Sequence, residues 1–170
     1  GDNDSFDIGR HIKSLYEHIP IVILTPFSHG ITARIADEDL SAFDYVFCWL
    51  GNTDLLVSII KLIEDKMNLE HDVAEVGVQL ILLVEDGIRF YSSVLPNLYK
   101  FVLKQSQEFS TEALNAHQRT LRMRGRPKIV LARTYAEAIT IYEKYKNNIL
   151  GVITDVRFPR VELSLIHISE

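Results

Sequence analysis

Short apolar runs alternate with amphipathic stretches along the chain, a pattern typical of strands and helices in turn. Residues 21–25 (IVILT) are wholly apolar and rich in β-branched side chains, which favours a parallel strand buried on both faces. Residues 6–18 show helical spacing and are stopped by Pro20. Further predicted elements are a helix at 31–40, a strand at 44–50 and a helix at 55–67. This order matches the second half of a doubly wound α/β domain.

The same alternation restarts after a polar stretch at residues 70–77, which we interpret as a linker. The predicted elements are strands at 78–84, 129–133 and 149–154 and helices at 88–104, 110–123 and 135–146, with Pro96 kinking the long helix. The pattern predicts the first half of a second doubly wound domain. We therefore expect a half-domain at 1–69, the linker at 70–77, another half-domain at 78–160 and a tail at 161–170.

Acidic residues follow two of the predicted parallel strands. Glu85 and Asp86 come directly after strand 78–84, and Asp155 comes directly after strand 149–154. Open α/β sheets hold ligands at the carboxyl ends of their strands, so the three carboxylates are expected in one crevice. Such a set favours a divalent cation with oxygen ligands. The alternative is that the acids only end the strands as solvated loop residues.

This arrangement resembles the receiver domain of bacterial response regulators. The resemblance rests on the acidic pair and on the sequence Asp155-Val156-Arg157-Phe158-Pro159. It implies a flavodoxin-like parallel sheet of order 2-1-3-4-5 and Asp155 as phosphoacceptor. Mg²⁺ would be held by Asp86, Asp155 and the main-chain carbonyl of Arg157, with Glu85 binding directly or through water. The implied partners are a histidine kinase or phosphotransfer protein and an attached output domain.

The first half also looks like a receiver, but with one departure. The sequence IPIVILTPFS resembles the fourth receiver strand, and its terminal hydroxyl falls on Thr25 as the switch residue; the alternative is a capping hydroxyl. The sequence DYVFCWLGNTDLL resembles the fifth strand, with Tyr45 in the place of the switch aromatic. The family's lysine falls on Cys48 and its proline on Trp49, so the usual ammonium group is missing.

A closer resemblance is to the tandem receiver-like region at the amino terminus of bacterial phosphoenolpyruvate synthase-like proteins, which carry a PEP/pyruvate-binding domain. It covers residues 6–160 and rests on VEDGIRFYSSVLPNLYKFVLKQ, EALNAHQRTLRMRGRPK and ARTYAEAITIYEKYK. The sequence contains neither an ATP-grasp region nor a phosphohistidine domain of such an enzyme. We therefore expect a regulatory fragment of a phosphorelay, not an enzyme.

Composition limits the partners and the cellular location that can be expected. A net charge of -5 argues against nucleic acid as a partner, and no apolar run approaches the roughly 20 residues of a membrane span. The single cysteine, Cys48, fits a reducing compartment, so a cytoplasmic location is expected. The polar opening GDNDS suggests an internal start. Residues 164–170 (SLIHISE) resemble a translated cloning adapter; the alternative is a short strand.

Two further hypotheses concern the chain as a whole. The basic cluster Arg119, Arg122, Arg124, Arg126 and Lys128 is interpreted as a solvated helix end rather than an anion-binding site. The two half-domains are complementary, so we expect them to close into one circularly permuted receiver, with strand 149–154 beside strand 21–25 and Thr25 near Asp155. The competing outcome is two unpaired half-domains. The leading function is a phosphoacceptor signalling module; the alternatives are a degenerate receiver scaffold without phosphotransfer and, least favoured, a catalytic piece of the synthase.

Overall fold

The computed structural model describes residues 4–26, 35, 38–108 and 125–155. The predicted helix at 31–40 lies mostly outside these residues, and the predicted helix at 110–123 and the tail at 161–170 lie entirely outside them. In chain order the elements are α1 (Ser5–Leu15), β1 (Val22–Pro26), β2 (Tyr45–Trp49), α3 (Asp54–Val76), β3 (Leu80–Val84), α4 (Ile88–Glu108), β4 (Lys128–Ala132), α6 (Tyr135–Tyr145) and β5 (Ile149–Thr154).

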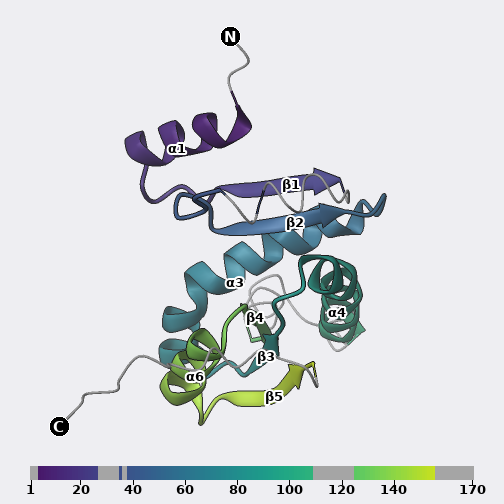
Figure 1. Ribbon diagram of the computed structural model, residues 1–170. Helices are drawn as coiled ribbons and strands as arrows, with labels where there is room; N and C mark the ends of the chain where they lie inside the picture. The colour runs from purple at the N-terminus through teal and green to yellow at the C-terminus, as the bar shows by residue number, and fades with distance from the viewer. Residues whose placement is uncertain (1–3, 27–34, 36–37, 109–124, 156–170) are drawn as a thin grey trace, which may run out of the picture.

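The described strands form two separate parallel sheets (Figure 1). One has two strands in the order β1-β2, and the other has three in the order β4-β3-β5. In the second sheet Val84 pairs with Ala132 on one side and with Thr154 on the other. The α/β class with parallel sheets is therefore confirmed. In the described part of the chain no helix is both long and apolar enough to span a membrane.

Helix α3 is longer than the sequence predicts. It runs through the stretch expected as a linker and ends at Val76, where Gly77 takes a left-handed conformation with φ of 68°. Leu62, Leu69 and Asp72 are all buried, so the helix keeps one inward face beyond the predicted end. Glycine suits the residue after a helix because it adopts positive φ without strain. Residues 70–76 are thus helical, and the connection to β3 is short.

The expected closure into one composite sheet is wrong. Strand β1 pairs only with β2 in the described structure, and β5 pairs only with β3, so Val22 and Ile153 belong to different sheets. The physical reason is α3, a continuous helix of 23 residues that packs against α4 and β4. It lies between the two-stranded sheet and the three-stranded one (Figure 1). The β1-β2 pair therefore does not reach β5.

One hydrophobic core nevertheless joins the two sheets. It brings together buried residues of β2, α3, β3, α4 and β4, among them Phe47, Leu62, Leu83, Leu95 and Leu131. The hydroxyl of Tyr91 on α4 donates a hydrogen bond to the carbonyl of Val46 on β2. The sheets are separate in hydrogen bonding but not in packing. In strand pairing the structure agrees with the alternative of two unpaired half-domains, but the two halves share one core.

Helix α1 is held against the two-stranded sheet by a smaller core. Phe6 meets Phe43 edge to face, with ring centroids 5.9 Å apart. The ring of Phe43 also lies so close to Gly9 that a Cβ added at this position would overlap it. The close approach of helix and ring therefore requires glycine at this position.

Replacing Gly9 with alanine is expected to destabilise the protein by about 1–3 kcal/mol through overpacking against Phe43. In an unobstructed helix the same change would stabilise by up to about 1 kcal/mol. Urea unfolding followed by circular dichroism measures the difference. Gly151→Ala is the control, because no described heavy atom lies within 4 Å of the added Cβ. Equal or greater stability of Gly9→Ala would contradict the packing described.

Candidate functional site

The carboxyl edge of the three-stranded sheet brings the predicted acids into neighbouring positions. Because Val84 pairs with both Ala132 and Thr154, the residues that follow these strands leave the sheet side by side. The amide of Glu85 donates to the carbonyl of Ala132 at 2.9 Å, which extends the ladder beyond β3. The side-by-side placement of β3 and β5 agrees with the sequence prediction. This edge is therefore the candidate functional site.

Glu85 is a positioned, buried acid with a structural partner. It is only 4% exposed, and its Oε1 accepts a hydrogen bond from the amide of Gly87 at 2.9 Å. A Cβ on Gly87 would lie 2.8 Å from this oxygen, so glycine lets the turn into α4 close over the carboxylate. Part of the capacity of Glu85 to accept hydrogen bonds or bind a cation is thus used by the β3–α4 turn.

Asp86 and Asp155 are both exposed at this edge. The hydroxyl of Thr154 donates to the carbonyl of Asp155 at 3.1 Å, which fixes the backbone as the chain leaves β5. Within the described ranges no three His, Cys, Asp or Glu side chains gather closely enough to form a metal centre. Arg157, predicted to offer its carbonyl, lies outside the described residues. The structure thus aligns the acids along one edge without forming a cluster of three ligands.

The expected hybrid site with Thr25 is wrong for the single chain. Thr25 lies in β1, pairs with Cys48 of β2 and is 8% exposed. Its hydroxyl donates to the carbonyl of Pro26 at 3.0 Å. Because β1 and β5 are in different sheets, strand pairing does not bring Thr25 to Asp155.

Cys48 is a core residue, as its apolar neighbours in the sequence indicate. It is 2% exposed, and its amide donates to Oγ of Ser92 on α4 at 2.9 Å. Burial raises the pKa of the Cys48 thiol, against a smaller lowering by the charge of Arg89. A thiol with a raised pKa is mostly protonated at neutral pH and is a poor nucleophile. Cys48 is therefore an uncharged, buried core thiol.

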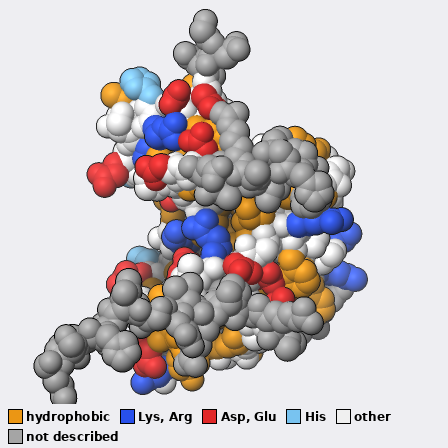
Figure 2. All heavy atoms as spheres, viewed as in Figure 1, with side chains coloured by type: hydrophobic (Ala, Val, Ile, Leu, Met, Phe, Trp, Pro, Cys, Tyr) orange, Lys and Arg blue, Asp and Glu red, His pale blue; other side chains and the backbone are white. Residues whose placement is uncertain are grey.

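Tyr45 links the two-stranded sheet to the candidate edge. Burial raises the pKa of Tyr45 to about 12. The Cζ of Arg133 lies 5.3 Å from its ring centroid, and Nζ of Lys66 lies 5.1 Å from it. Arg133 directly follows β4, and its amide donates to Oε2 of Glu137 at 2.8 Å. Basic and acidic side chains meet in the hollow between the upper and lower parts of the molecule (Figure 2).

The structure contains a buried ion-pair network that the sequence does not predict. Asp65 of α3 is fully buried. Its carboxylate accepts hydrogen bonds from both terminal nitrogens of Arg126, at 2.6 Å from Nη2 and 3.1 Å from Nη1. It also accepts from the hydroxyl of Tyr99 and the amide of Ile129, each at 2.9 Å. Lys128 pairs with Asp72 at 2.8 Å. These contacts fasten α3 to the start of β4.

The interpretation of the basic cluster as a solvated helix end is therefore wrong for two of its members. The side chains of Arg126 and Lys128 are only 5% and 7% exposed, because acidic residues of α3 neutralise them. Arg119, Arg122 and Arg124 lie outside the described residues. The sequence signal was a single aspartate on the apolar face of a predicted helix, but its partner is 61 residues away.

Comparison with known proteins gives no assignment. No protein-family model, no curated protein and no solved structure matches this chain.

Proposed function

We propose that this chain is a receiver-like signalling module in which Asp155 accepts a phosphoryl group and regulates an attached output. One observation carries the proposal: the order β4-β3-β5 sets Asp155 beside Glu85 and Asp86 at the carboxyl edge of a parallel sheet. Ligands of open α/β sheets bind at such edges. The resemblance to tandem receivers of phosphoenolpyruvate synthase-like proteins suggests an output of that kind and a phosphohistidine protein as donor.

The oxygen donors at this edge fit Mg²⁺. Magnesium is usually bound through one or two carboxylates and keeps several waters, so a dedicated cluster of three carboxylates is not required. Asp86 and Asp155 are the exposed carboxylates that would hold it, with the carbonyl of Arg157 and with Glu85 acting through water. When bound, the cation would neutralise the negative charge of the phosphoryl oxygens as they approach the carboxylate.

The transfer itself uses a carboxylate oxygen of Asp155 as nucleophile. This oxygen forms a bond to phosphorus while the bond between phosphorus and the donor breaks, and the donor leaves with the bonding electron pair. With acetyl phosphate the leaving group is acetate and the product is an acyl phosphate on Asp155. The exposure of Asp155 permits in-line approach of the donor. Burial of Glu85 against the Gly87 amide keeps the neighbouring turn in place.

The proposal is tested by incubation with Mg²⁺ and acetyl phosphate, followed by intact-mass measurement. We expect the native chain to gain one phosphoryl group, Asp155→Asn to gain none, and Asp86→Asn to react at least about tenfold more slowly through weaker metal binding. Chelation of Mg²⁺ should stop the reaction. Asp7→Asn, an exposed acid on α1, is the matched control and should react like the native chain. Phosphoryl gain by Asp155→Asn would refute the assignment.

A second candidate function is an interaction scaffold without phosphotransfer. The observation that favours it is Cys48, an uncharged thiol that occupies the place of the family's lysine and is buried beside Ser92. On this hypothesis the native chain gains no phosphoryl group in the same experiment.

A further inference from the structure

Both sheets have a free outer strand in the described part of the chain. Strand β5 pairs through one edge with β3, and strand β1 pairs through one edge with β2. Both pairings are parallel. An unpaired strand edge presents backbone N–H and C=O groups that are ready to pair with another strand. In the described sheets β2 and β4 are outer strands too, but they are almost wholly buried, whereas β1 and β5 carry exposed side chains.

Strand β5 is unusually exposed for a strand of a parallel sheet. Leu150 is 53%, Val152 48% and Ile153 38% exposed. Successive strand residues point to opposite faces, so Val152 and Ile153 show that both faces of β5 are uncovered. Parallel strands are normally buried on both faces. Among the described residues β5 is therefore covered on neither face, and its outer edge is unpaired.

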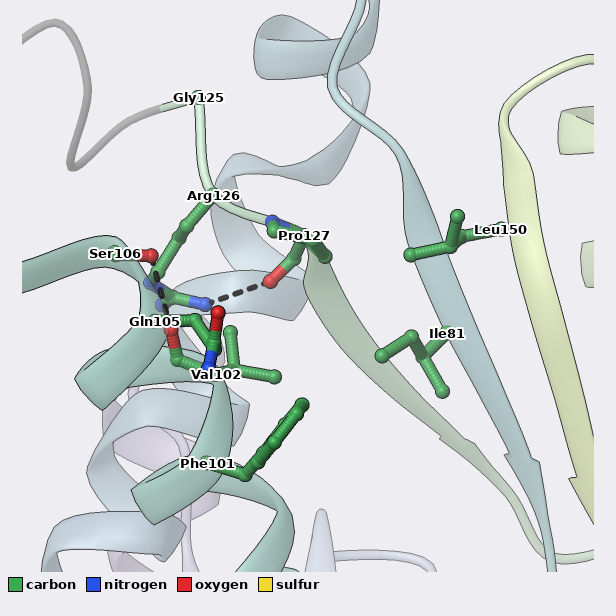
Figure 3. Close-up of a pocket in the computed structure, with 9 residues that line it drawn as sticks. All are labelled: Ile81, Phe101, Val102, Gln105, Ser106, Gly125, Arg126, Pro127 and Leu150. Carbon is green, nitrogen blue, oxygen red and sulfur yellow. Dashed lines mark hydrogen bonds between the residues drawn. The ribbon is translucent and has the colours of Figure 1, made fainter. Parts of the chain in front are cut away.

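The face of the three-stranded sheet beside β5 is also open. Ile81 of β3 and Leu150 of β5 line a cavity of about 510 Å³ together with Phe101 of α4 (Figure 3). Arg126 and Pro127 form its other side, but the guanidinium of Arg126 is engaged by Asp65 and by the carbonyl of Pro127. The cavity is therefore mainly an apolar surface next to the strand whose outer edge is unpaired in the described structure.

The chain's own β1 does not supply the missing neighbour. Helix α3 is continuous over 23 residues, about 34 Å at 1.5 Å per residue, and the network at Asp65 fastens it to β4. It stands between β1 and β5, so pairing within one chain would require this helix to break or detach. Pairing between two chains leaves α3 intact in each.

We propose that two copies of this chain pair reciprocally, with β1 of each copy adding in parallel to β5 of the other. Each junction joins a two-stranded and a three-stranded sheet into one parallel sheet of five, in which β1 and β5 become internal. Strand β1 fits this role: it is apolar, about as long as β5, and its Leu24 is 42% exposed. Pro26, which has no N–H, is the last residue of β1, so the four residues before it keep the backbone N–H groups that strand pairing uses.

Reciprocal pairing also suits the area that a stable dimer needs. A specific interface buries about 800 Å² on each partner, which a single junction between two short strands falls short of. In the reciprocal dimer each copy contributes both its β1 edge and its β5 edge, so the buried surface is doubled. Exchange of identical elements between protomers is a common route to dimers.

The dimer would complete the proposed site. Parallel pairing aligns the carboxyl ends of the strands, so Thr25 of the partner subunit would lie beside Asp155. This consequence rests on the proposed function, whereas the strand pairing does not. In this arrangement each phosphoacceptor would have a hydroxyl from the other chain next to it.

The test is cross-linking between two single-cysteine variants, Leu24→Cys and Val152→Cys, each in a Cys48→Ser background, with one variant isotopically labelled. The two are mixed and treated with a thiol cross-linker that spans about 8 Å, since neighbouring strands lie about 4.8 Å apart and positions 24 and 152 are offset by two residues of about 3.3 Å each. We expect a covalent dimer that joins position 24 of one copy to position 152 of the other. A product formed by Val152→Cys alone would indicate β5 paired with β5 and would overturn the proposal. A monomeric native mass by light scattering at high protein concentration would also overturn it.

Two charge substitutions provide a second measurement. Val152→Asp should raise the dimer dissociation constant at least about tenfold, because it places an unpaired charge on the apolar sheet face beside the junction of β1 and β5. Ile139→Asp is the matched control on α6, with a similar native exposure of 42%, and should leave the constant unchanged within about twofold. Circular dichroism verifies that both variants fold. Asp155→Asn should still dimerise while accepting no phosphoryl group, which separates this inference from the proposed function.

Discussion

Replacing Asp65 with alanine is expected to destabilise the protein by about 3–5 kcal/mol. Asp65 is fully buried and is the carboxylate that neutralises Arg126, whose side chain is only 5% exposed. Its removal leaves a buried guanidinium unpaired and takes the acceptor from the hydroxyl of Tyr99 and the amide of Ile129. Guanidinium chloride unfolding, read by circular dichroism, measures the loss.

The neighbouring residue supplies a matched control. Glu64 pairs with Lys61 at 2.6 Å, a distance as short as that of the buried pair, but both side chains are substantially exposed. Because water screens such a pair, Glu64→Ala should cost no more than about 0.5 kcal/mol. Equal losses for the two alanine variants would contradict the role assigned to burial.

A double variant identifies the cause of the loss. If the unpaired charge is responsible, then Asp65→Leu combined with Arg126→Met should be more stable than Asp65→Ala alone, because apolar replacement of a buried pair is often nearly neutral. A double variant that is less stable than the single one would mean that the hydrogen bonds to Tyr99 and Ile129 dominate instead.

The strands and most helices could be predicted from the sequence because their signals are local. The predicted strand at 149–154 has the same bounds as β5, and the apolar run at 129–133 is offset by one residue from β4. The end of α3 could not be predicted in this way. Its last turns are polar in composition, and their helical nature depends on Leu69 and Asp72 packing against elements that come later in the chain.

The candidate site was predictable only in part, for the same reason. That Glu85 and Asp155 leave adjacent strands follows from strand order, which the alternation of elements indicates. The hydrogen bond from the amide of Gly87 to the carboxylate of Glu85 could not be predicted, because it depends on the geometry of one turn. The separation of Thr25 from Asp155 depends on α3, since a long continuous helix holds apart two sheets whose edges are otherwise compatible.

Replacing Phe47 with alanine is expected to cost about 3–5 kcal/mol and to destabilise both sheets together. Phe47 of β2 is fully buried, and its ring meets that of Tyr91 on α4 edge to face with centroids 5.5 Å apart. It belongs to the core that also contains Leu83 and Leu131 of the three-stranded sheet. A cavity at this position therefore weakens the packing that joins the halves. Phe101→Ala on the exposed side of α4, where the native side chain is 64% exposed, is the control and should cost less than about 1 kcal/mol.

Two probes decide whether the halves are one cooperative unit. Trp49 fluorescence reports on β2, and hydrogen exchange at the amides of Ile129 and Leu131 reports on β4. Because one core joins these strands, Phe47→Ala should lower the unfolding free energy seen by both probes by the same amount. A change seen by Trp49 alone, with β4 protection unaltered, would mean that the two-stranded sheet unfolds independently. Equal changes would mean that the packing between α3, α4 and both sheets, rather than strand pairing, makes this chain fold as a single unit.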